Sequence, residues 1–240
     1  MNIWLCRREN FLKETSKWSA VGGLFLACGV FVSPGVASAQ IPAPSPQTPT
    51  DAARKVNERP GEAAATPPEP FDGATTDKMG AHCVTLETEV GPIEIEMMPE
   101  VAPESTRSFL NLAVAGAFDT TTFTRVVKGF IIQGGSLATS EKWGVELSKR
   151  AARRLPDEPG LIKHVRGIVS MARTDEPNSA STHFFILVGD GPHLNSKFAA
   201  FGRVRKGIEV ADAINLAETD GEKPLKPVRI NRAVVSQCVK

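Results

Sequence analysis

The chain has 240 residues, of which 41% are apolar, enough for one domain of ordinary size together with additional segments. Its 28 basic and 27 acidic side chains leave a net charge of +1 at pH 7, so the charge gives no indication of a nucleic-acid partner. The sequence has no metal-ligand spacing, no glycine-rich phosphate loop and no nucleophile elbow, so we expect neither a metal nor a cofactor.

Residues 1–39 have the layout of a signal peptide. A basic segment ends at Lys17, an uncharged apolar stretch runs from Trp18 to Val32, and Ala37-Ser38-Ala39 forms a cleavage site before Gln40. The apolar stretch is shorter than the roughly 20 residues that cross a bilayer, so we expect no stable membrane span. The segment therefore predicts export of the chain to the periplasm of a bacterium.

The route of export is open in two respects. Arg7-Arg8 followed by Phe11-Leu12-Lys13 resembles a twin-arginine signal with one extra residue, and we rank this route second to general secretion. Cys28 follows a poor lipobox, which makes a lipid-anchored form the weaker alternative to a freely exported protein.

Residues 40–81 are predicted to be a disordered linker. They contain eight prolines among Ala, Thr, Ser and Glu and hardly any large apolar residue. Such a composition cannot bury enough apolar surface to offset the entropy lost on ordering. A proline-rich recognition motif is the functional alternative to a simple spacer.

The folded domain is placed at residues 82–240, and its first and last segments alternate between apolar and polar residues. Val84–Glu89 and Ile93–Met97 flank a Val-Gly-Pro break and predict a β-hairpin. Val228–Val235 alternates in the same way and predicts a final strand.

Two helices are expected within this domain. One begins at Pro103 and ends at Gly116, which agrees with the preference for proline at helix starts and glycine at helix ends. The other fits Gly207–Leu216. The remaining chain has the pattern of short strands and turns, and many strands with two helices favour a mainly β fold, a closed barrel capped by the helices.

One arginine stands inside a run of strand-forming residues at 123–135. Alternation places Phe123, Arg125 and Val127 on one face of this strand, and Gly129 permits a turn before the chain continues extended to Gln133. An arginine is rarely fully buried without a partner. An edge strand whose arginine points to water is the alternative interpretation of this window.

Three sequence blocks resemble the cyclophilin family of peptidyl-prolyl cis-trans isomerases. The first is F-x-R-V-V-x-G-F-x-x-Q-G-G at residues 123–135. The second combines S-M-A-R-T at 170–174 with P-N-S-A-S-T-H-F-F-I at 177–186, and the third is H-L-N-S-K-F-A-A-F-G-R-V at 193–204. The resemblance extends from Cys83 to the C-terminus and implies an eight-stranded antiparallel barrel.

The resemblance also implies the site. Arg125 and Gln133 would be catalytic, and Arg125 suits the task because it is always charged and its donors reach the proline nitrogen only in the twisted amide. The substrate-binding residues would be Phe130, Ile131, Ala172, Arg173, His183, Phe185, Leu194 and Phe198.

Three positions depart from the family pattern. His183 stands where the family usually has glutamine, and His193 stands where the eukaryotic members have tryptophan. Phe198 occupies a position often held by histidine or tyrosine and keeps the wall apolar.

We therefore predict an exported peptidyl-prolyl cis-trans isomerase that acts as a monomer on proline-containing polypeptides and binds no nucleic acid. The alternative from another functional class is a non-catalytic proline-binding or chaperone module on the same barrel. Such a module would need the apolar socket but not Arg125.

Cys83 and Cys238 are the cysteines left after the signal is removed. In the barrel that the chain resembles, the strands beside them are antiparallel neighbours, which could bring their Cα atoms within the roughly 4.4–6.8 Å of a disulfide. An oxidising compartment permits the bond. Two free thiols on frayed ends are the alternative.

Overall fold

The computed structural model describes residues 68–238, so the signal peptide predicted at 1–39 and the linker residues 40–67 lie outside the described part. The strands are β1 (His82–Thr88), β2 (Gly91–Met97), β3 (Arg125–Val127), β4 (Ile131–Gly134), β5 (Ile168–Met171), β6 (Phe184–Leu187), β7 (Ala200–Lys206), β8 (Thr219–Asp220), β9 (Lys223–Pro224) and β10 (Ile230–Gln237). The helices are α1 (Thr76–Gly80), α2 (Pro103–Val114), α3 (Val145–Ala151) and α4 (Ile208–Asn215), with short 3-10 turns η1 (Leu137–Thr139) and η2 (Pro192–Leu194).

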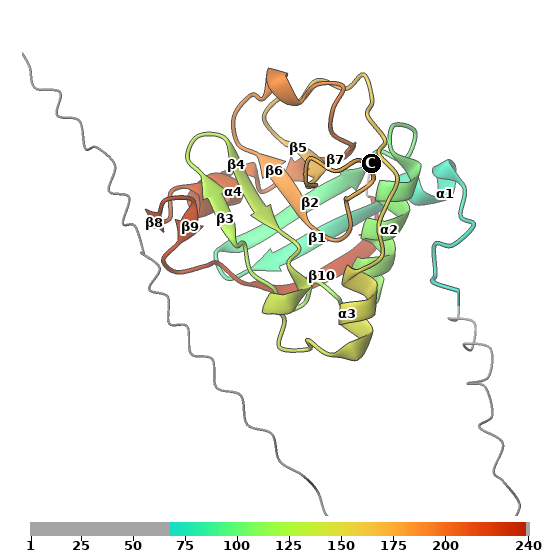
Figure 1. The fold of residues 1–240 in the computed structure, drawn as a ribbon, viewed down its shortest axis with the longest axis horizontal. Coiled ribbons are helices and arrows are strands. Elements are labelled where there is room, and N and C mark those ends of the chain that lie inside the picture. Colours follow the sequence, from blue (N-terminus) through green and yellow to red (C-terminus); the bar gives the residue numbers. More distant parts are fainter. Residues whose placement is uncertain (1–67, 239–240) are drawn as a thin grey trace, which may run out of the picture. The chain divides into compact units, whose positions relative to one another are not determined.

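Eight strands form one antiparallel sheet in the order β10-β1-β2-β7-β5-β6-β4-β3, as Figure 1 shows. The predicted hairpin is confirmed as β1 and β2, and the predicted last strand is β10. The mainly β class with eight antiparallel strands is therefore confirmed for the described residues.

The prediction of a closed barrel is wrong, because the sheet is an open half-barrel with β3 and β10 at its edges. The chain just before β3 approaches the start of β10, where Phe123 N donates to Val228 O at 2.9 Å and Thr122 forms an isolated bridge with Arg229. The outer edge of β3 is covered differently. Val126 N donates to Glu222 O at 2.7 Å, so the β8–β9 hairpin satisfies this edge and β10 does not.

The two predicted helices are confirmed as α2 and α4, which lie at opposite ends of the view in Figure 1. Phe109 of α2 anchors the main core, with its ring centroid 4.8–5.3 Å from those of Phe118, Phe184 and Phe201. The first turn of α2 is capped by Glu158, whose carboxylate accepts hydrogen bonds at 2.8 Å from two backbone N–H groups.

Residues 68–81 fold onto the domain, so the predicted linker boundary at residue 82 is wrong. Phe71 and Met79 are buried, although the segment around them is polar. Arg107 of α2 donates to the carbonyls of Phe71 at 2.6 Å and Ala74 at 3.0 Å, and Asn111 Oδ1 accepts from Phe71 N at 2.8 Å. Two apolar anchors and side chains that bind the backbone are thus enough to order a segment whose overall composition predicted disorder.

Cys83 and Cys238 form a disulfide with a Cα–Cα separation of 5.0 Å. The antiparallel pairing of β1 with β10 places Cys83 opposite Ser236, and Cys238 N donates to Ala81 O at 2.9 Å just beyond the ladder. The predicted bridge and the strand pairing on which it depended are both confirmed.

Within residues 68–238, none of the helices is long and apolar enough to pass through a membrane.

Candidate functional site

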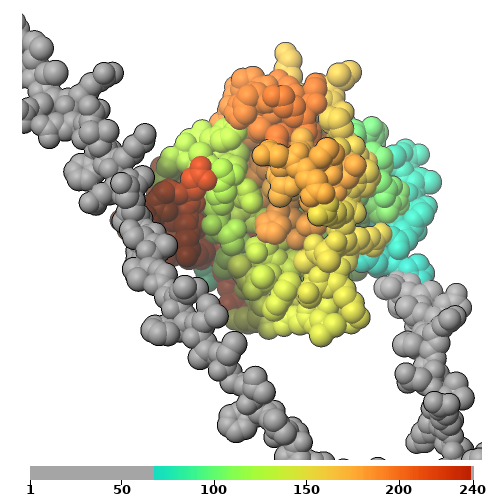
Figure 2. Space-filling model, viewed as in Figure 1, coloured from blue at the N-terminus to red at the C-terminus, as the bar shows by residue number. Residues whose placement is uncertain are grey.

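Strand alternation gives the β3-β4-β6-β5 part of the sheet two different apolar faces. Ile132 of β4 and Phe184 of β6 belong to the main core around Phe109. Their neighbours Ile131 and Phe185 belong to a second cluster on the opposite face. The candidate site lies on this second face, where β3 and β4 (green) border β6 and η2 (orange) in Figure 2.

The register of the sheet brings the catalytic candidates into one row. Arg125 of β3 lies opposite Gln133 of β4, and Gln133 lies opposite Phe185 of β6. Phe185 in turn lies opposite Ser170 of β5. Residues directly opposite in antiparallel strands have neighbouring side chains on the same face, so a guanidinium, an amide and an aromatic ring stand side by side.

The guanidinium of Arg125 has two side-chain partners. Its Nη1 donates to Gln133 Oε1 at 3.3 Å, and its Nε donates to Glu222 Oε2 at 2.6 Å. The Arg125 side chain is 44% exposed, so the head group is oriented by these contacts while remaining open to a ligand. The alternative of an arginine that merely points to water does not describe this geometry.

Phe123 does not share the face of Arg125, contrary to the prediction. It is fully buried in the main core, with its ring centroid 6.3 Å from that of Phe184. The strand begins only at Arg125, and Phe123 bonds instead to Val228. The period-two alternation therefore does not extend back to it.

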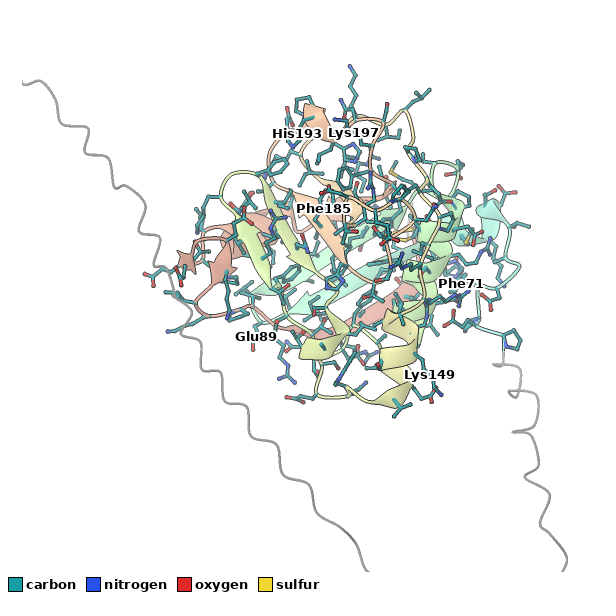
Figure 3. The ribbon with its side chains drawn as sticks, in the orientation of Figure 1. Phe71, Glu89, Lys149, Phe185, His193 and Lys197 are labelled. Atoms are coloured by element: carbon teal, nitrogen blue, oxygen red, sulfur yellow. A yellow bond between two sulfur atoms is a disulfide. The ribbon has the colours of Figure 1, made fainter. Side chains whose placement is uncertain are left out.

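The second apolar cluster contains all six predicted apolar residues of the site. Its buried members are Ile131, Ile168, Phe185, Leu187, Leu194 and Ala200, with Val127, Phe130, Ile162, Ala172 and Phe198 packed against them. The rings of Phe185 and Phe198 meet edge to face at 5.9 Å, and Phe130 lies 5.2 Å from the ring of His193. Figure 3 shows His193 and Lys197 at the top of the molecule and Phe185 below them, nearer its centre.

The wall that carries Leu194 is held from behind by buried His164. The backbone N–H of His164 donates to Asn195 Oδ1 at 2.7 Å, and its carbonyl accepts from Gly191 N at 2.8 Å. Its Nε2 lies 2.9 Å from Ser170 Oγ. Burial lowers the pKa of His164, so the neutral imidazole is the form suited to this position.

Ala172 and Arg173 contribute unequally to the predicted backbone contact with a substrate. Ala172 N donates to His183 O at 2.9 Å, so this N–H is already occupied. Within residues 68–238 the backbone N–H and C=O of Arg173 have no partner and can pair with an extended chain. The Arg173 guanidinium lies 5.1 Å from the Phe198 ring centre and donates to Lys197 O at 3.2 Å, which ties the wall together.

His183 lies at the edge of the site, half-buried just before β6. Burial lowers its pKa, so its imidazole is neutral at pH 7 and can donate one hydrogen bond.

The close approach of the segment just before β6 to β4 depends on Gly135, which has φ +85°. A Cβ at that position would lie 2.2 Å from Thr182 O.

Two residues that support the site, Asn215 and Glu222, do not stand out in the sequence. Asn215, buried at the end of α4, donates to Val127 O at 2.8 Å and Ile131 O at 3.0 Å and accepts from Gly129 N at 2.8 Å. It thereby holds the turn that presents Phe130. An asparagine at a helix end has the pattern of an ordinary cap, and Glu222 has the pattern of an ordinary turn residue, so neither stood out.

Comparison with known proteins places these features in a family. The sequence model of "Cyclophilin type peptidyl-prolyl cis-trans isomerase/CLD" matches residues 83–235. The chain is 37% identical over 155 residues to peptidyl-prolyl cis-trans isomerase CYP18-1 of Arabidopsis thaliana, covering 63% of this chain and 94% of that protein. It is 35% identical over 162 residues to peptidyl-prolyl cis-trans isomerase A of Dickeya dadantii, covering 65% of this chain and 83% of that protein.

A solved structure gives the same result. A cyclophilin-type peptidyl-prolyl cis-trans isomerase of Cryptosporidium parvum, crystallised in the presence of the dipeptide Ala-Pro, is 30% identical in sequence with a TM-score of 0.58. The alignment covers 65% of this chain and 99% of that one.

Proposed function

The chain belongs to the cyclophilin-type peptidyl-prolyl cis-trans isomerases, and from this premise we propose that Arg125 carries its catalysis by stabilising the twisted amide of an X–Pro bond. The observation that supports this assignment is the row formed by Arg125, Gln133 and Phe185 across three adjacent strands. It sets a permanent cation at the edge of an apolar surface that suits a proline ring.

The chemistry requires no bond to be broken. Rotation about the peptide bond faces a barrier of about 18–20 kcal/mol because the C–N bond has partial double-bond character. In the twisted state conjugation is lost, and the proline nitrogen regains a lone pair that can accept a hydrogen bond. A donor placed there stabilises the transition state more than either planar form, which is what lowers a barrier.

Each side chain of the site has a part in this proposal. The cluster around Phe185, with Phe130 and Phe198 at its rim, holds the proline ring so that one side of the bond is fixed. Arg125 donates to the proline nitrogen as it becomes pyramidal. Gln133 holds the guanidinium through Nη1 and offers its own amide N–H₂ to the substrate carbonyl.

The client chain is held on the opposite side of the site. The unpaired backbone groups of Arg173 suit an extended polypeptide, since they offer one donor and one acceptor. The neutral imidazole of His183 supplies one polar contact where the family usually has a glutamine amide. Proline-containing polypeptides are thus the proposed partners, bound by a monomer.

The proposed setting is the periplasm of a bacterium. The basic and apolar segments at 1–39 with their Ala-Ser-Ala cleavage site support export, and a structural disulfide is typical of an oxidising compartment. Mass spectrometry of the protein expressed in a Gram-negative host tests this. The proposal expects a soluble periplasmic chain that begins at Gln40, and a diacylated Cys28 in the membrane fraction would contradict it.

The mechanism predicts different effects on turnover and on substrate binding. Exchange NMR on an X–Pro peptide can measure both kcat and KM for the 240-residue protein. Phe198→Ala should raise KM with less effect on kcat, because it removes apolar contact made in all states of the substrate. Arg125→Ala should lower kcat while the peptide still binds. If the unsubstituted protein binds the peptide but does not accelerate its isomerisation, the non-catalytic proline-binding module is favoured instead.

A further inference from the structure

Glu222 is tied to β3 through both its backbone and its side chain. It follows Gly221, whose positive φ of +59° closes the turn between β8 and β9. The Glu222 carbonyl accepts from Val126 N at 2.7 Å, and its Oε2 accepts from the Nε of the adjacent Arg125 at 2.6 Å. The hairpin is thus fixed by main-chain bonding at the point where the carboxylate meets the guanidinium.

The two contacts divide the donors of Arg125 in a defined way. An arginine has five N–H donors in a rigid planar fork. Glu222 takes the Nε–H and Gln133 takes one N–H of Nη1. Among the residues that the structure describes, the guanidinium has no further partner, so its remaining donors at Nη1 and Nη2 are available to a substrate. Two fixed N–H groups set the plane in which the others point.

This pair is not suited to a role in stability. The side chains of Arg125 and Glu222 are 44% and 54% exposed, and ion pairs at such exposure contribute little to folding. A catalytic donor has stricter requirements, since a displacement of about 1 Å can lower the rate by about 10²-fold. Removing Glu222 should therefore affect turnover more than the fold.

We propose that Glu222 is a positioning residue for catalysis, which holds the Arg125 guanidinium in the plane where it meets the proline nitrogen. This inference rests on the proposed function of Arg125. In this proposal Glu222 affects only the transition state, so removal of its side chain should lower kcat and leave KM unchanged.

The test compares Glu222→Ala, Glu222→Gln and Asp220→Ala in the 240-residue protein. Asp220 lies in the same hairpin and is exposed, so its replacement removes the same charge without touching the arginine. We expect Glu222→Ala to lower kcat about tenfold. This lies between the small effect of losing an exposed ion pair and the about 10²-fold loss caused by a misplaced catalytic donor. Glu222→Gln keeps an acceptor for Nε and should stay within about threefold of the unsubstituted rate. Asp220→Ala should match the unsubstituted protein.

A double-substitution cycle adds a readout that a structural role would not move. Glu222→Ala should have no further effect on kcat in an Arg125→Ala background, because the two residues act as a unit. The Nε–H resonance of Arg125 should also shift in Glu222→Ala but not in Asp220→Ala.

The outcomes separate the two proposals. Turnover in Glu222→Ala equal to that in Asp220→Ala would overturn the positioning role while leaving the function of Arg125 intact, provided Arg125→Ala is impaired. Full activity in Arg125→Ala would remove the basis of both.

Discussion

The disulfide joins the two ends of the folded domain, and breaking it should lower stability without altering the site. Cys83 and Cys238 are 155 residues apart in the sequence. Loop-closure entropy for a cross-link of that span gives about 5 kcal/mol at 25 °C, and measured bridges typically contribute about 2–4 kcal/mol. The ladder between β1 and β10 is formed by backbone hydrogen bonds that do not involve the sulfur atoms, so the reduced protein should still fold.

Urea unfolding of the oxidised and reduced protein measures this effect without a substitution. With a slope of about 2 kcal/mol per molar urea, a loss of about 2–4 kcal/mol shifts the midpoint down by about 1–2 M. Cys83 is buried, so Cys83→Ser would add the cost of burying a hydroxyl to the loss of the bridge. Reduction by dithiothreitol is the cleaner perturbation for that reason.

Thiol titration decides how an unchanged midpoint is to be understood. Cys6 and Cys28 lie in the segment that export would remove, so the unfolded, unreduced chain that begins at Gln40 should show no free thiol. Two free thiols would refute the bridge itself. No free thiol and no shift on reduction would refute the entropic reasoning while leaving the bridge in place. Isomerase activity should be equal in both redox states, since β1 and β10 carry none of the site residues.

Two further predictions concern the support of the site. Burial lowers the pKa of His183 and His164 in the folded protein, whereas the same groups in the unfolded chain keep the ordinary pKa of about 6.5. As the pH drops through this window the unfolded chain binds more protons than the folded protein, so the free energy of unfolding falls. The urea midpoint should therefore fall less between pH 7.5 and pH 5 for His183→Gln than for the unsubstituted protein, and identical falls would exclude a contribution from His183. Asn215→Ala leaves the buried Ile131 carbonyl without its donor, at about 1–3 kcal/mol, and removes the bonds to the half-buried Val127 carbonyl and the exposed Gly129 N–H. Thermal unfolding should therefore shift down, and KM should rise as the turn carrying Phe130 loosens. An unchanged KM in the folded variant would contradict the role given to that turn.

The predictions from sequence succeeded where local pattern and packing agree. The alternation of β1 and β2 and the apolar stripes of α2 and α4 report residues that are buried in the fold. In β10 the strand is present as predicted, but its buried residues are Ile230 and Ala233, which do not alternate. The resemblance supplied the site residues, and the register of β3, β4 and β6 brings Arg125, Gln133 and Phe185 together.

The errors arose where tertiary contacts override local pattern. Helix α3 has no buried residue, so no apolar stripe marks it in the sequence. The polar segment 68–81 is ordered by Arg107 and Asn111, which come from a distant helix. The edge of β3 is covered, and Glu222 is placed, by hydrogen bonds between segments almost a hundred residues apart, which no sequence periodicity records.

The central claim is that the charge and donor geometry of Arg125 lower the barrier to rotation. The most direct test is kcat/KM for an X–Pro peptide, measured by exchange NMR on the 240-residue protein and its Arg125→Ala and Arg125→Lys variants. Loss of one preorganised donor should lower kcat/KM by about 10²–10³-fold in Arg125→Ala. Lysine keeps the charge but not the planar fork, so Arg125→Lys should recover only part of the loss. Activity in a folded Arg125→Ala equal to that of the unsubstituted protein would contradict the account.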